Sequence, residues 1–108
     1  MKIAICEDER LFQQKLKSGI ERFFAEKKTE TEFDCFMNGE ELIHNLNKEY
    51  DVIFLDINFG TKADGMDIAE QLRNENVSAP VIFVTSFENR AIDGYDVGAY
   101  GFVVKKHL

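Results

Sequence analysis

The chain has 108 residues, of which 44% are apolar, and it carries a formal charge of −7 at pH 7. This length suffices for one domain with a single core, and ten phenylalanines with one proline are typical of an ordered globular chain. The acidic balance excludes a nucleic-acid-binding face of the usual kind, because phosphate contacts need clustered basic residues. No apolar stretch approaches the roughly 18 residues of a membrane span, so we expect a cytoplasmic protein.

The first half of the chain alternates between short apolar runs and helical patterns. We predict a strand over residues 2–6 and a helix over 10–27, where apolar residues recur at spacings of three and four. The apolar stripe of this helix contains Phe12, Leu16, Ile20, Phe23 and Phe24. A second strand is predicted over 32–36, and after an Asn-Gly turn a short helix over 40–47.

Two cysteines, Cys6 and Cys35, lie within these predicted strands. A disulfide between them is not excluded if the strands are neighbours. We interpret both as buried thiols that act as small hydrophobic side chains.

The run at residues 51–56 is the most informative stretch of the chain. Residues 52–55 are bulky or β-branched and include no polar side chain, which is typical of a strand buried on both faces of a parallel sheet. The run ends on Asp56. A carboxylate there lies at the carboxyl end of the strand, where open α/β sheets bind their ligands.

The rest of the chain continues the alternation. The predicted elements are a helix over 65–74, a strand over 81–84, a helix over 88–96 and a strand over 101–104. This alternation predicts an α/β fold with a doubly wound, five-stranded parallel sheet covered by helices on both faces. A fifth helix would be needed after the last strand, so we interpret residues 1–108 as one domain truncated at that point. We therefore expect exposed apolar surface beside the first helix.

Polar side chains follow the predicted strands at their carboxyl ends. In chain order they are Glu7, Asp8, Asp56, Thr85 and Lys105. Because the carboxyl ends of parallel strands meet at one edge of the sheet, we expect these side chains to lie together. Clustered carboxylates repel unless a cation relieves them, and Mg²⁺ is the natural cation because it takes oxygen ligands. A metal beside a carboxylate, a lysine and a hydroxyl indicates phosphoryl transfer to the carboxylate.

Five short motifs occur in the order, and nearly at the spacing, of a known family. They are Ile-Cys-Glu7-Asp8-Glu, Phe-Leu-Asp56-Ile, Asp64-Gly65, Val-Thr85-Ser and Val-Val-Lys105. With these motifs the chain resembles the receiver domain of two-component response regulators, over its whole length up to the missing last helix. The resemblance implies a flavodoxin-like fold with strand order 2-1-3-4-5 and a function as a phosphorylation-dependent signalling switch.

The resemblance also implies roles for the acids. Asp56 would accept a phosphoryl group from a sensor histidine kinase. Glu7, Asp8 and Asp56 would bind Mg²⁺, and the backbone carbonyl of Asn58 would be a further ligand. Such a receiver catalyses its own phosphorylation and dephosphorylation and is not an enzyme that turns over a diffusible substrate.

Three further residues receive roles by the same resemblance. Lys105 would hold the phosphate, Thr85 would be the switch hydroxyl, and Phe102 stands at the position of the aromatic switch residue. Each also has a structural interpretation. Thr85 could be a β-former without a task and Phe102 a core residue, while Lys106 could replace Lys105 as the phosphate ligand.

Three features depart from the family pattern. Glu7 stands where aspartate is commoner, the loop over 57–63 lacks proline and is one residue longer, and Lys106 stands in place of a proline. The glutamate and the long loop are similar to those of receivers paired with LytTR-type DNA-binding domains. This similarity implies a covalently linked output domain that binds DNA and regulates transcription, and it leaves homodimer formation open.

Two alternatives compete with an active switch. The altered loop and the Lys105-Lys106 pair motivate a degenerate pseudo-receiver, a protein-interaction module that works without phosphorylation. The residues around Asp56 also resemble the nucleophile motif of haloacid-dehalogenase-type phosphatases. That motif needs an aspartate as general acid two residues later, where Asn58 stands, so we favour the receiver.

Overall fold

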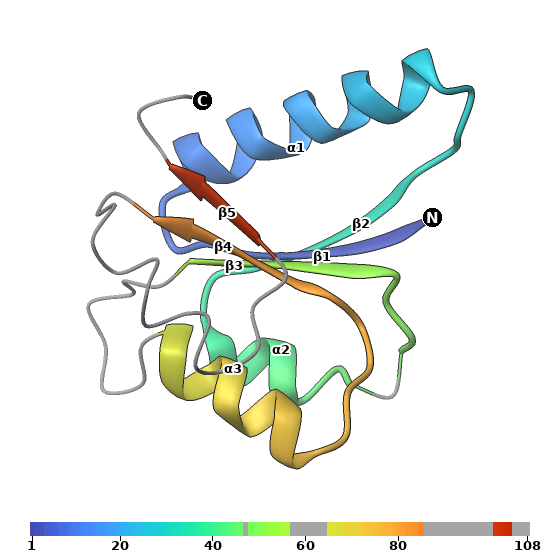
Figure 1. Ribbon diagram of the computed structural model, residues 1–108. Coiled ribbons are helices and arrows are strands. Elements are labelled where there is room, and N and C mark those ends of the chain that lie inside the picture. The colour runs from blue at the N-terminus through green and yellow to red at the C-terminus, as the bar shows by residue number, and fades with distance from the viewer. Residues whose placement is uncertain (47, 57–64, 86–100, 105–108) are drawn as a thin grey trace.

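The computed structural model describes residues 1–46, 48–56, 65–85 and 101–104, with the backbone alone at 65, 66, 85 and 102–104. Strands and helices alternate along these ranges (Figure 1). The strands are β1 (Lys2–Cys6), β2 (Glu32–Phe36), β3 (Val52–Asp56), β4 (Val81–Thr85) and β5 (Gly101–Val104). The helices are α1 (Arg10–Glu26), α2 (Gly39–Ile43) and α3 (Gly65–Asn74). The predicted helix over 88–96 and the loop over 57–63 lie outside the described residues.

The strands form a parallel sheet in the order β2-β1-β3-β4-β5. The order 2-1-3-4 of the first four strands confirms the prediction, and the β5 backbone pairs with β4. Ile53, Phe54 and Leu55 of β3 are all buried, which explains why this strand is continuously apolar in sequence. Cys6 of β1 pairs with Leu55, so the residues that follow both strands emerge side by side.

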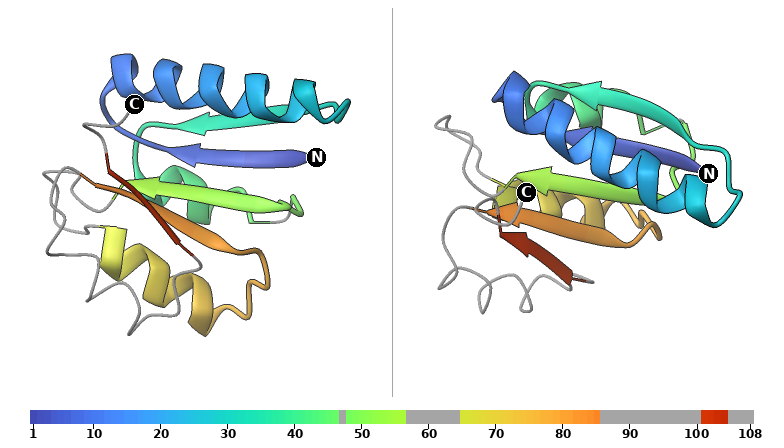
Figure 2. Two further views of the ribbon diagram at one scale, coloured as in Figure 1. Left: turned by 45° about the horizontal axis from the view of Figure 1, so that its top comes forward. Right: turned by 90° about the horizontal axis from the view of Figure 1, so that it is seen from above.

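The three helices that the structure describes lie on both faces of the sheet. Helix α1 lies across one face, and α2 and α3 lie across the other (Figures 1 and 2). Successive β3 side chains alternate between the two cores. Phe54 packs in the core beneath α1, whereas Ile53 and Leu55 belong to the core beneath α2 and α3. The predicted doubly wound arrangement, with helices on both faces, is therefore present around the strands β2, β1, β3 and β4.

Helix α1 forms as predicted but buries a narrower stripe. Leu16 and Ile20 are buried, whereas Phe23, which the periodicity places in the same stripe, is 53% exposed. An apolar groove of about 340 Å³ runs between this helix and the sheet. Its lining residues are Leu16, Gly19, Ile20, Phe23, Phe24, Phe54 and Ile82. The groove is the apolar surface that the sequence predicts beside the first helix.

Helix α2 is shorter than the predicted helix over 40–47. The Asn38 side chain caps its first turn by accepting a hydrogen bond from the Glu41 N–H at 2.9 Å. Gly39 lies directly against Ile68 of α3, and a Cβ atom at this position would overlap that side chain. The Asn45 amide donates to the Glu41 carbonyl at 2.7 Å, which gives a carbonyl at the helix end a side-chain partner where the chain turns away.

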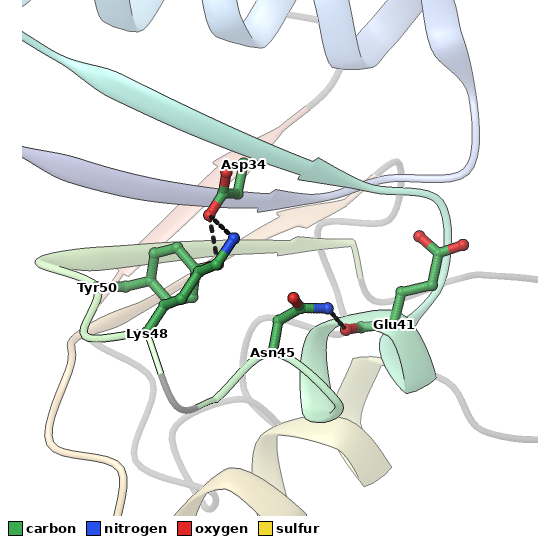
Figure 3. A network of polar contacts seen from close by, with 5 residues as sticks. All are labelled: Asp34, Glu41, Asn45, Lys48 and Tyr50. Carbon is green, nitrogen blue, oxygen red and sulfur yellow. Dashed lines mark hydrogen bonds and ion pairs between the residues drawn. The ribbon is translucent and has the colours of Figure 1, made fainter.

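A polar group lies between β2 and the segment that leads into β3 (Figure 3). It consists of Asp34, Lys48 and Tyr50 and is here called the tyrosine network. The Tyr50 hydroxyl donates to the Asp34 carboxylate at 2.7 Å, and the Lys48 ammonium lies 3.6 Å from the same oxygen. The Tyr50 ring packs edge-to-face on Phe36, with the ring centroids 6.4 Å apart. The hydrogen bond from Tyr50 holds the pKa of Asp34 below its usual value, and burial together with Asp34 raises the pKa of Tyr50.

Both cysteines are free thiols, and only one is buried. Cys6 lies in the core, whereas Cys35 is exposed on β2. The prediction that both are buried is wrong for Cys35, because β2 is at the edge of the sheet and α1 covers it incompletely. Phe33, on the same face of β2, is likewise only partly buried.

Candidate functional site

Three carboxyl groups come together at the carboxyl edge of the sheet. Glu7 and Asp8 directly follow β1, and Asp56 is the last residue of the adjacent β3. Oxygen atoms of all three side chains lie within 4.8 Å of one another. This acidic cluster, defined as Glu7, Asp8 and Asp56, is the convergence that the parallel strand ends predict.

The acidic cluster is withdrawn from solvent. Glu7 and Asp56 are each 1% exposed, and Asp8 is partly buried. Burial raises the pKa of the neighbouring Cys6 thiol, and the charges of Asp56, Glu41 and Glu7 raise it further. A thiolate is thus disfavoured at Cys6, mainly because the side chain is buried and further because these carboxylates are close to it.

The backbone around the acidic cluster is held by hydrogen bonds to neighbouring elements. The Glu7 N–H donates to the Phe36 carbonyl at the end of β2 at 3.0 Å. Glu9 is the N-cap residue of α1, and its carbonyl accepts from the Gln13 N–H at 2.9 Å. The Gln13 side-chain amide reaches back to the Glu7 carbonyl at 3.3 Å. The sequence did not predict a role for Gln13 at the site. The only signal for one is its position in the first turn of the helix that follows Glu7 and Asp8.

Of the other predicted site residues, the structure describes only the backbone of Thr85 and Phe102. Thr85 is the last residue of β4 and follows Val84, which pairs with Asp56. The Thr85 backbone therefore lies at the same edge of the sheet as the acidic cluster. Phe102 lies on β5, where its backbone pairs with that of Phe83. The side chains of Thr85 and Phe102, and all of Asn58 and Lys105, lie outside the described residues.

The donor set of the acidic cluster fits a hard divalent cation. Mg²⁺ binds oxygen ligands at about 2.1 Å, so two oxygens on opposite sides of one ion lie about 4.2 Å apart. The carboxylate oxygens here, all within 4.8 Å of one another, are near the spacing of oxygen ligands around one such ion. A bound cation would also relieve the repulsion between buried like charges.

The sequence of the whole chain identifies the family. A sequence profile of the response regulator receiver domain matches residues 3–107. The chain belongs to this family. Receiver domains are components of two-component signalling, so the match also decides against the haloacid-dehalogenase alternative.

Known proteins and structures resemble this receiver over nearly all of its length. The sensory transduction protein LytT of Bacillus anthracis is 29% identical over 106 residues, which cover 97% of this chain and 41% of LytT. This receiver therefore spans about two fifths of the length of that relative. The response regulatory domain of protein mrkE from Klebsiella pneumoniae has a TM-score of 0.80 and 28% identity, covering 97% of this chain and 83% of that one.

A more distant solved structure shares the fold. Response regulator TrrA from Thermotoga maritima, in complex with Mg(2+)-BeF, has a TM-score of 0.73 and 24% identity, covering 95% of this chain and 84% of that one. None of the helices in the described part of this receiver has the length and apolar character that crossing a bilayer requires.

Proposed function

We propose that this receiver is a phosphorylation-dependent switch whose acceptor is Asp56. The observation that carries the proposal is the placement of Asp56 at the end of a buried strand, with its oxygen within 4.8 Å of oxygens from Glu7 and Asp8. In the transfer step an Asp56 oxygen attacks the phosphorus of a phosphohistidine, and the new P–O bond forms as the P–N bond breaks. The electron pair of the broken bond goes to the histidine nitrogen, which takes up a proton and leaves as a neutral imidazole. The product is an acyl phosphate on Asp56.

The acids have separate tasks in this proposal. Glu7 and Asp8 would hold Mg²⁺ together with Asp56, and the Asn58 carbonyl would be a further ligand. The bound ion supplies charge neutralisation for the phosphoryl oxygens as they approach a buried carboxylate. TrrA, the relative solved in complex with Mg(2+)-BeF, supports this choice of ion. The same residues support slow hydrolysis of the acyl phosphate, so the domain resets itself without a diffusible substrate.

Three residues extend the proposal beyond the described site. Lys105 binds the phosphoryl group, Thr85 moves its hydroxyl toward it, and Phe102 follows as the aromatic switch residue. The position of Thr85 at the end of β4, in register with the edge that carries Asp56, supports its role. The phosphorylated form then selects one of two conformations that already exchange in the unmodified domain.

The partners follow from the family and from the length of its relatives. A receiver implies a sensor histidine kinase as phosphodonor, and we place both in the cytoplasm. LytT is more than twice as long as this chain, since 106 aligned residues are 41% of it. That length supports a covalently linked output domain, for which we propose LytTR-type DNA binding and control of transcription. We also propose homodimerisation in response to phosphorylation.

The groove beside α1 supports the proposal that the receiver fold is completed by a further helix. The complete fold would be flavodoxin-like, with the strand order 2-1-3-4-5 and a helix after β5 packed beside α1 on the same face of the sheet. Its apolar face would cover Phe23, Phe54 and Ile82, which line the groove.

The pseudo-receiver remains the second candidate, because the loop over 57–63 and Lys106 depart from the family pattern. The intact mass of the full chain after incubation with acetyl phosphate and Mg²⁺ separates the two. A switch gains one phosphoryl group in the wild type and in Asp67→Asn, an exposed control on α3, but not in Asp56→Asn. No gain in any of the proteins would support the pseudo-receiver, and a gain in Asp56→Asn would move the acceptor elsewhere.

A further inference from the structure

Gln13 stands where three segments of the chain meet. It lies on α1, and its side-chain nitrogen Nε2 is 3.3 Å from the Glu7 carbonyl oxygen and 3.4 Å from the Phe36 carbonyl oxygen. The same nitrogen lies 3.8 Å from the Met37 sulfur. One amide therefore joins the first helix to the segments that leave β1 and β2.

The Glu7 carbonyl belongs to the peptide group that links Glu7 to Asp8. A peptide group is planar, so a hydrogen bond to this oxygen restrains ψ of Glu7 and φ of Asp8 together. The Glu7 N–H, on the preceding peptide, donates to the Phe36 carbonyl at 3.0 Å. Glu7 is thus held on both sides, and the bond from Gln13 restrains the backbone from which the two neighbouring carboxylates project.

The acceptors of the Gln13 amide are themselves held in place. The Phe36 carbonyl is fixed by the bond from Glu7, and the Met37 N–H donates to the Glu41 carboxylate at 3.2 Å. Glu41 in turn lies in the first turn of α2, which Asn38 caps. Gln13 therefore links the acidic cluster to the end of β2 and, through Met37 and Glu41, to the start of α2.

We infer that Gln13 is a positioning residue for Mg²⁺ at the acidic cluster, an inference that rests on the proposed function. Only a side chain with two N–H groups on one nitrogen can donate to both carbonyls from this position. Methionine has nearly the same length and no donor. Glutamate has the same shape but turns a donor into a charged acceptor beside two carbonyl oxygens and close to Glu7.

The chain offers a matched control at the next position. Gln14 is the same residue type on the same helix and is exposed to solvent. Gln13→Met and Gln14→Met therefore make the same chemical change with and without the contact to the Glu7 carbonyl. Gln13→Glu and Gln14→Glu make the same change in net charge at both positions.

The test is isothermal titration of Mg²⁺ into the full chain, without a phosphodonor, at a temperature where melting curves show each variant to be folded. Partners that orient metal ligands typically contribute about 10–100-fold to metal affinity, and since Gln13 acts through the backbone we expect a loss of about three- to tenfold in Gln13→Met. Gln13→Glu should lose more, and both Gln14 variants should bind as the wild type does. The binding heat that is present in the wild type and lost in Asp8→Asn is the heat of Mg²⁺ binding at the acidic cluster.

The outcomes separate this inference from the proposed function. Equal affinities in Gln13→Met and Gln14→Met overturn the inference, even if Asp56 is phosphorylated. The expected ratio of affinities, together with a wild type that is never phosphorylated, supports the inference and overturns the switch. A wild type that takes up no Mg²⁺ overturns both. Should Gln13→Met and Gln13→Ala both fail to fold, the inference is overturned as well, because Gln13 would then serve the fold and not the metal.

Discussion

Two polar clusters on this receiver bring charged groups together in opposite ways. In the tyrosine network a carboxylate faces a hydroxyl donor at 2.7 Å and an ammonium at 3.6 Å, so unlike groups meet. In the acidic cluster three carboxyl groups lie within 4.8 Å of one another, so like groups meet. The first arrangement stabilises the fold as it stands, whereas the second becomes favourable when a cation is added. A site for function can therefore be distinguished from a structural contact by its charge balance.

The largest effect that this comparison predicts is stabilisation by Mg²⁺. A ligand that binds only the folded state adds about 2.7 kcal/mol to the free energy of unfolding at a concentration 100 times its Kd. We expect this gain in urea denaturation of the wild type and of Tyr50→Phe, and its removal by a chelator. Asp8→Asn, which removes a charge from the acidic cluster, should lose most of it. A similar Mg²⁺ gain in Asp8→Asn would show that the ion binds elsewhere.

The next effect concerns the tyrosine network without metal. Tyr50→Phe removes the hydroxyl that donates to Asp34 and should lower the free energy of unfolding by about 1 kcal/mol, the usual contribution of one hydrogen bond. The measurement is urea denaturation at pH 7 with a chelator present. The ring and its packing on Phe36 remain, so the change isolates the hydroxyl. Unchanged stability would mean that water replaces the hydroxyl without cost.

The contribution of Tyr50 should also depend on pH. The hydrogen bond lowers the pKa of Asp34 in the folded state, so its stabilisation is present above the unfolded pKa of about 3.9 and is lost as the pH falls through the folded value. The pKa of Tyr50 is raised, so its share is present below the unfolded pKa of about 10 and is lost as the pH rises through the folded value. The difference between wild type and Tyr50→Phe should therefore be largest between these limits. Urea denaturation from pH 3 to 11 measures it, and a difference that is constant with pH would contradict the pairing with Asp34.

The acidic cluster could be predicted from sequence because it depends on strand ends alone. Once the apolar runs before Glu7 and up to Asp56 are identified as parallel strands, their ends must meet at one edge of the sheet. The same logic places Thr85 at that edge. The order of the first four strands follows from the resemblance to receivers, since alternation by itself permits several orders.

Some features could not be predicted because they depend on contacts between distant segments, which leave no recognisable pattern in the local sequence. Tyr50 and Asp34 are 16 residues apart, and nothing in either segment marks them as partners. Gln13 and Gln14 are identical side chains that only the helix rotation distinguishes. Cys35 is exposed because its strand is at the edge of the sheet, where α1 covers it incompletely.

The smallest effect that the comparison predicts belongs to Lys48. Its ammonium lies 3.6 Å from Asp34, but its side chain is 45% exposed, so water and salt screen the pair. Lys48→Met should lower the free energy of unfolding by no more than about 0.5 kcal/mol at low salt. At about 1 M NaCl, where the screening length is about 3 Å, the difference should vanish, whereas the loss in Tyr50→Phe should persist. Urea denaturation of both variants at the two salt concentrations measures this contrast. If Lys48→Met lost as much as Tyr50→Phe, and lost it in high salt, the ammonium rather than the hydroxyl would be the main partner of Asp34.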